Sequence, residues 1–234
     1  MVSLTWKQRA VGAQGDDGPA SCLARARKRG TKRGTKRGTT DYQRNTACDT
    51  GPVAAMDDLV DRLDAALVAL DGLGPKVIAG EPWPLAGTVG PGPESSWGPR
   101  EVLAHVAEML PFWMGEIELV IDAEVVRIDS LVVRAGGSDR VEVEPPAFGR
   151  LEDDPLRIGI IDRDRAFPSR ELLARVNVEG RRVAERLRAL DAREAGMLGR
   201  HPTRGDLTVA DIAERLIVSH VEGHVTQLGE TLAG

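Results

Sequence analysis

The chain has 234 residues, 41% of them hydrophobic, which is enough to bury one substantial core. Its charge is divided: residues 1–55 carry 11 Lys and Arg against 4 Asp and Glu, a net +7, whereas residues 56–234 carry 20 against 32, a net −12. Both cysteines, Cys22 and Cys48, lie in the basic segment, which excludes a disulfide, a zinc–thiolate cluster and a cysteine nucleophile from residues 56–234.

The basic segment contains a short repeat. The motif Lys28–Thr31 recurs twice, through Thr39, among residues that show no apolar period, so we expect residues 1–55 to form a disordered tail. Two interpretations are open: an arm that neutralises nucleic-acid phosphates, or a segment without function that precedes the true start at Met56. The lack of an interleaved aromatic pattern favours the second, and nucleic acid is not the expected partner.

The first two helices are predicted from apolar residues that recur at three- and four-residue steps. One helix is expected over Asp57–Leu70, with Gly72 and Gly74 as its stop. A Pro- and Gly-rich connection follows, and a second helix begins at Pro99 and runs toward Val126. Pro111 lies inside this second helix and predicts an interruption or kink.

Residues 127–167 have no clear period and predict a long irregular excursion, with Leu131–Val133 and Val141–Val143 as candidate short strands. A third helix is expected over Ser169–Leu190. A fourth begins at Thr208, where Asp211 three residues later predicts a capping box. Residues 56–234 should therefore form an all-α domain, an up-and-down four-helix bundle with one long irregular crossover.

No stretch resembles a secretory signal, and no apolar run approaches the roughly 20 residues of a membrane span. We therefore expect a cytoplasmic protein that does not bind membranes. Abundant Ala, Gly and Val, with Arg in excess over Lys, are typical of a bacterial genome rich in G and C.

Three histidines stand at positions where a bundle could bring them together. His220 and His224 are one turn apart on the apolar face of the fourth helix, and His105 is on the inward face of the second. Facing helices that supply convergent ligands are how bundles hold interior metal ions, with coordination positions left open for catalysis. The alternative is that each imidazole is an ordinary core residue, although three packed together would then leave nitrogen lone pairs unpaired.

Three further residues are candidates for the site. Glu108, and behind it Glu101, lie one turn from His105 and could act as a general base, or could be solvated charges at the helix edge. Gln227 lies seven residues after His220 and could contact a cofactor or substrate, or bond across the bundle.

Two motifs resemble the DinB-like (YfiT-like) superfamily. Residues Trp97–His105 are similar to the second-helix signature of that family. Gly199–Pro202, Gly205–Asp211 and the following His220, His224 and Gln227 resemble its last-helix pattern, and together the match spans about residues 56–231. The resemblance implies a four-helix bundle with a divalent metal, usually zinc and in some members nickel or iron, whose three ligands map onto His105, His220 and His224.

Family activities include S-transfer of a low-molecular-weight thiol such as mycothiol, isomerisation of maleylpyruvate and metal-dependent hydrolysis. The mycothiol-dependent isomerases have Glu where this chain has His220, together with a further C-terminal domain, so that activity is not expected. The leading hypothesis is a metal-dependent thiol S-transferase that acts on a small molecule. Its alternatives are a hydrolase that uses hydroxide on the metal and a non-catalytic, stress-related metal-binding module. Because bundles of this kind often pair, a homodimer is one state to expect.

Overall fold

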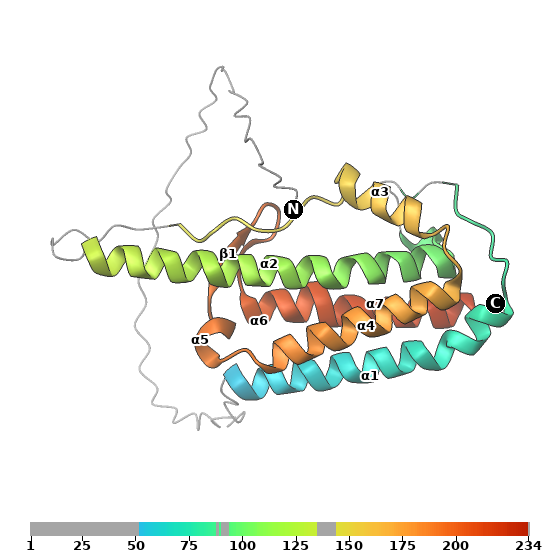
Figure 1. The fold of residues 1–234 in the computed structure, drawn as a ribbon, viewed down its shortest axis with the longest axis horizontal. Coiled ribbons are helices and arrows are strands. Elements are labelled where there is room, and N and C mark those ends of the chain that lie inside the picture. Colours follow the sequence, from blue (N-terminus) through green and yellow to red (C-terminus); the bar gives the residue numbers. More distant parts are fainter. Residues whose placement is uncertain (1–51, 88, 90–93, 135–143, 234) are drawn as a thin grey trace, which may run out of the picture. The chain divides into compact units, whose positions relative to one another are not determined.

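The computed structural model describes residues 52–87, 89, 94–134 and 144–233 (Figure 1). This part of the chain is mostly helical and contains one small sheet of two strands. Nearly all of the predicted tail, and the candidate strand Val141–Val143, lie outside the described residues. No helix among the described residues is both long enough and apolar enough to cross a membrane.

The described part of the chain has three long helices: α1 (Pro52–Ala79), α2 (Pro99–Arg134) and α4 (Ser169–Arg188). Shorter helices lie between or after them: η1 (Glu94–Ser96), α3 (Pro155–Asp164) and α5 (Ala192–Ala195). The chain ends in one continuous rod made of α6 (Val209–Ile212), the π-helical turn η2 (Ala213–Val218) and α7 (Ser219–Thr231). Both α4 and this last rod pack against α1 and against α2, so each lies between those two helices (Figure 1).

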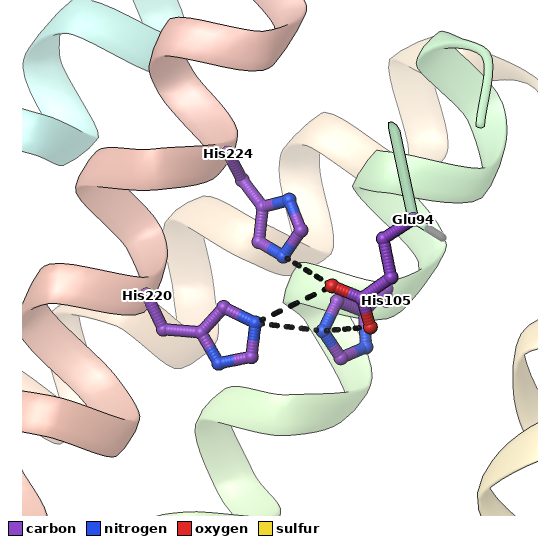
Figure 2. A group of neighbouring side chains, drawn as sticks. All are labelled: Glu94, His105, His220 and His224. Carbon is purple, nitrogen blue, oxygen red and sulfur yellow. Dashed lines mark hydrogen bonds and ion pairs between the residues drawn. The ribbon is translucent and has the colours of Figure 1, made fainter. Parts of the chain in front are cut away.

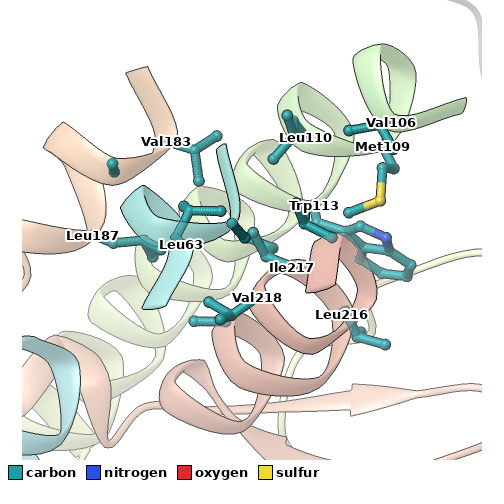
Figure 3. Close-up of a cluster of buried hydrophobic side chains, with 14 of the residues drawn as sticks. Leu63, Val106, Met109, Leu110, Trp113, Val183, Leu187, Leu216, Ile217 and Val218 are labelled. Carbon is teal, nitrogen blue, oxygen red and sulfur yellow. The ribbon is translucent and has the colours of Figure 1, made fainter. Parts of the chain in front are cut away.

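The helices enclose a single apolar core. Leu63 of α1, Val183 and Leu187 of α4, and Ile217 and Val218 of η2 are each at most 1% exposed and belong to it (Figure 3). Residues of α2 complete the cluster, Val106, Met109 and Leu110 among them. Burial of this apolar surface is the main force that holds the helices together.

The first helix is longer than its sequence predicts. It continues past Gly72 and Gly74 to Ala79, because Val77 is fully buried and its packing outweighs the helix-breaking tendency of glycine. A Cβ at Gly74 would lie 3.3 Å from Leu173, so the glycine also allows α4 to approach α1 closely.

The second helix is also longer. It runs without interruption through Pro111, which is exposed, to Arg134, so the prediction of an interruption was wrong. Leu131–Val133 are helical and do not form a strand. The predicted irregular excursion contains α3, whose start combines Pro155 at the first helical position with a hydrogen bond from Leu156 N to the Asp154 carboxylate.

The loop before the last rod contains a hairpin that the sequence did not predict. Strand β1 (Leu198–His201) pairs antiparallel with β2 (Gly205–Thr208), and Ala147 forms a parallel bridge to Arg200. The predicted capping box is present: Thr208 Oγ1 accepts a hydrogen bond from Asp211 N at 3.0 Å, and Asp211 accepts one from Thr208 N. The hairpin therefore leads directly into the helix that carries two of the histidines.

Candidate metal centre

The structure brings the three predicted histidines together. His105 of α2 faces His220 and His224 of α7, and the Nε2 atoms of His105 and His220 are 3.3 Å apart (Figure 2). The rings of His220 and His224 are stacked, with their centroids 4.8 Å apart, as expected for residues one helical turn apart. His105 and His224 are 2% and 4% exposed, whereas the His220 side chain is 29% exposed, so the histidines extend from the interior to its edge.

A fourth residue, Glu94 of η1, joins this group. Its Oε2 lies 3.8 Å from Nε2 of both His220 and His224, and its Oε1 lies 3.9 Å from Nε2 of His105 (Figure 2). One ligand atom from each of the four residues lies within 4.8 Å of the others. The sequence analysis missed Glu94, although it is the only charged residue between Glu81 and Arg100.

Several contacts hold Glu94 in this position. Arg157 of α3 forms an ion pair with its carboxylate, and Trp97 N donates to its backbone oxygen at 3.0 Å. The buried Trp97 ring meets His105 edge-on with their centroids 5.4 Å apart, and the Arg157 guanidinium lies 5.7 Å from a ring centroid of Trp97. Contacts with Arg157 of α3 and with Trp97 therefore position Glu94 beside the histidines. Its position does not follow from the periodicity of a long helix.

Gln227 fixes the orientation of His224. Its amide nitrogen donates a hydrogen bond to the backbone oxygen of Glu94. The amide oxygen therefore faces His224 Nδ1, at a distance of 3.0 Å. Since an amide oxygen only accepts, Nδ1 of His224 carries the proton and Nε2 keeps its lone pair. Gln227 thus lies behind a candidate ligand. It does not line the cavity that opens beside the histidines.

The pKa values of His105, His224 and Glu94 are shifted toward the protonation states that a metal ligand needs. Burial is the main reason that the pKa of His105 lies well below its ordinary value, and it also lowers the pKa of His224, although the hydrogen bond to Gln227 acts the other way. Burial alone would raise the pKa of Glu94, but His220 and the charge of Arg157 outweigh it and hold that pKa well below its usual range. Neutral imidazoles and an ionised carboxylate are the forms that bind metals.

One distance in the group equals that expected around a metal ion. The ligand atoms of a tetrahedral zinc ion, with bonds of about 2.0 Å, lie about 3.3 Å from one another. The Nε2 atoms of His105 and His220 are 3.3 Å apart, whereas the Glu94 oxygens lie 3.8–3.9 Å from the three nitrogens and would have to move closer to bind the same ion. His224 Nε2 is buried and has no hydrogen-bond partner among the described residues. Glu94, His105, His220 and His224 therefore form a group that could hold a metal ion.

The two carboxylates predicted as general bases lie outside this group. Glu108 is paired with Arg150 at 2.5 Å, and its Oε2 lies 3.9 Å from His105 Nδ1, on the side of the ring away from Glu94. Burial raises the pKa of Glu108, whereas the hydrogen bond from Arg150 lowers it. Glu108 thus lies behind His105, but its carboxylate is too far from Nδ1 for a hydrogen bond.

Glu101 is fully buried and has a structural set of partners. It accepts a hydrogen bond from Ala86 N at 2.8 Å and another from Arg165 at 3.2 Å. These bonds tie the loop after α1 and the end of α3 to α2. Neither Glu101 nor Glu108 is among the residues that line the cavity beside the histidines.

A cavity of about 750 Å³ opens beside the metal group. Glu94, His105 and His220 form part of its wall, so a molecule in the cavity can reach the candidate ligands. The fourth histidine, His201 at the end of β1, also lines the cavity. A Cβ at Gly149 would lie 2.6 Å from His201 Cδ2, so glycine is required for this ring to fit.

Comparison of the chain with protein-family models, with curated proteins and with solved structures finds no match.

Proposed function

We propose that the chain is a metal-dependent enzyme of the DinB-like type, in which α1, α2, α4 and the last rod constitute a four-helix bundle. The observation that carries the proposal is the convergence of Glu94, His105, His220 and His224 at the wall of a cavity. A group held for structure alone would be closed to solvent on all sides, whereas this one borders a space large enough for a small-molecule substrate.

Zinc is the metal that we propose for the centre. Three imidazole nitrogens and one carboxylate oxygen suit a borderline ion without strong geometric preferences. When bound, such an ion supplies positive charge that stabilises a thiolate or a developing oxyanion. Two surrounding residues hold ligands in place: Gln227 is hydrogen-bonded to His224, and Arg157 anchors Glu94.

The reaction class that we propose is transfer of a low-molecular-weight thiol to an electrophile. Both cysteines lie within the first 48 residues, so the thiol has to enter as a cosubstrate. Two features support this reaction. The cavity of about 750 Å³ is large enough for two small reactants, and arginine residues on its wall favour the anionic form of a thiol.

Hydrolysis is the second candidate, and Glu94 is the observation that favours it. This carboxylate lies within 3.9 Å of three imidazole nitrogens and is held in its ionised form. In this alternative the three imidazoles alone hold the metal, and the Glu94 carboxylate accepts a proton from a water molecule as it attacks a substrate in the cavity.

Elemental analysis of the purified full chain, beside His105→Ala and His224→Ala, tests the metal proposal. We expect about one equivalent of metal in the parent and loss of that metal in both variants. His201→Ala is the matched control, because His201 lines the same cavity but lies outside the metal group, and it should retain the metal. Circular dichroism confirms that each variant is folded, and a parent without stoichiometric metal overturns the proposal.

Two assays on the metal-loaded protein then separate the reaction classes. Consumption of a thiol in the presence of a chlorinated aromatic or an epoxide indicates transfer, and release of acid from an ester or amide without thiol indicates hydrolysis. Glu94→Gln should lower hydrolysis strongly if that carboxylate accepts the proton. Bound metal with neither activity contradicts the enzyme proposal in favour of a non-catalytic metal-binding module.

A further inference from the structure

The cavity is also lined by hydrogen-bond donors that do not belong to the metal group. This donor wall consists of His201, Thr203, Arg204 and Arg215, all of which line the cavity. The first three come from β1 and the turn that follows it, and Arg215 comes from η2. The same space is therefore bordered both by candidate metal ligands and by cationic and neutral donors.

The π-helical turn η2 lies beside the cavity. Arg215 and Leu216 of η2 line it together with Ser219 and His220 of α7, so the two elements turn one common face to this space. Single π-helical turns of this kind are frequent at functional sites.

The arginines of the cavity differ in how well they are neutralised. Arg150 forms an ion pair with Glu108, and Arg157 with Glu94. Arg215 is 3.6 Å from Asp211, too far for a hydrogen bond, and the other oxygen of that carboxylate is taken by Thr208. Arg204 has no ion-pair partner in the part of the chain that the structure describes. Among the described residues, the cavity therefore has one guanidinium group without an ion pair, Arg204, and one, Arg215, whose ion pair with Asp211 is long at 3.6 Å.

His201 adds a neutral donor to the same wall. Thr203 N donates to His201 Nδ1 at 3.3 Å, which makes Nδ1 an acceptor and places the ring proton on Nε2. Burial, and then the charge of Arg204, lower the pKa of His201, so the imidazole is neutral at pH 7 and still carries one N–H. The wall therefore offers an N–H from an imidazole and two guanidinium groups.

We infer that the donor wall binds an anionic group of the substrate, a carboxylate or a phosphate, while the reacting part of the same molecule lies at the metal group. Guanidinium groups bind both anions through paired N–H donors, and this geometry gives them specificity as well as affinity. The inference rests on the proposed function for the reacting end. It makes Arg204 and Arg215 the residues that select the substrate.

Isothermal titration of the metal-free full chain with inorganic phosphate and, separately, with succinate tests the inference. Removal of the metal matters because a bound ion would itself bind either anion. At fixed ionic strength we expect the parent to bind at least one of the two, and Arg204→Gln and Arg215→Gln each to weaken that binding by about tenfold or more. Both side chains are exposed, so the variants should fold. The anion that binds shows which chemistry the wall accepts.

Arg182→Gln is the matched control. Arg182 is an exposed residue of α4 that pairs with Glu179 and is not among the residues that line the cavity, so its removal changes the net charge equally. Its binding of the anion should equal that of the parent. The inference fails if the parent binds neither anion, if the two cavity variants bind as the parent does, or if the control loses as much. Because the titration contains no metal, these outcomes are independent of the metal content that tests the proposed function.

Discussion

Two regions of the interior differ in chemistry although the same helices enclose both. In the cluster of Figure 3, Leu63, Leu187 and Ile217 are fully buried and apolar, and every group is satisfied by packing. In the region of Figure 2, His105 and His224 are almost as deeply buried, but His105 Nδ1 and His224 Nε2 have no hydrogen-bond partner among the described residues. Buried polar atoms without partners lower stability.

This difference assigns separate tasks to the two regions. Burial of the apolar cluster supplies the free energy that holds α1, α4 and η2 together. In the histidine region, the unpaired ligand atoms lie close together and lower the stability, and the apolar cluster has to offset this loss. Changes in the first region should therefore alter stability without altering metal binding, and changes around the second should do the reverse.

The largest effect is expected from Leu63→Ala in the apolar cluster. The side chain is fully buried, so its truncation should lower the free energy of unfolding by about 2–5 kcal/mol through lost burial and the cavity left behind. Urea denaturation measures this loss, and the metal content of the folded variant should equal that of the parent. On the same helix Val68 is 73% exposed, and Val68→Ala should change stability by less than about 0.5 kcal/mol. Loss of metal from a folded Leu63→Ala protein would show that the two regions are coupled.

The reverse effect is expected from Gln227→Leu, which changes a residue that touches both His224 and Glu94. Without the amide, the tautomer of His224 and the position of Glu94 are no longer fixed, and the affinity for zinc should fall by about 10–100-fold. Competition with a chelator of known affinity measures this change. Glu230→Leu on the exposed side of the same helix is the control and should bind zinc as the parent does. Parent-like affinity in Gln227→Leu would remove the positioning role.

Helical periodicity was sufficient to predict the site residues that lie on long helices. The spacing of His220 and His224, and the apolar neighbours of His105, predicted that the three rings face one interior, and the structure places them there. The capping box at Thr208 was also predictable, because it depends only on residues three positions apart.

Residues in irregular segments were not predictable in the same way. Glu94 reaches the site from a three-residue helix that is positioned by Arg157, 63 residues away in the sequence. His201 reaches the cavity through a hairpin that packs beside Gly149. Both positions depend on contacts between distant segments, which no local period encodes. The opposite error affected Glu101: its spacing from His105 suggested catalysis, but its bonds to Ala86 and Arg165 serve the fold.

The smallest effect is expected at the start of the last rod, which passes through both regions. Thr208→Ala removes the hydroxyl that binds Asp211 N and the Asp211 carboxylate, and it should lower the free energy of unfolding of the metal-free protein by about 1 kcal/mol at pH 7. The hydrogen bond from Thr208, opposed by burial, lowers the pKa of Asp211 below its ordinary value of 3.8. A carboxyl group with a lowered pKa in the folded state contributes stability above pH 3.8, and this contribution is lost as the pH falls through the folded value.

The cost of Thr208→Ala should therefore shrink when the pH is lowered below 3.8, because the parent then loses the same charged hydrogen bond that the variant lacks. Urea denaturation of both proteins at pH 7 and at pH 3 measures the two differences. Thr226→Ala is the control, since the Thr226 hydroxyl donates only to a helix carbonyl, and its effect should not depend on pH. A cost for Thr208→Ala that is equal at both pH values would show that the cap stabilises the rod without the charge of Asp211.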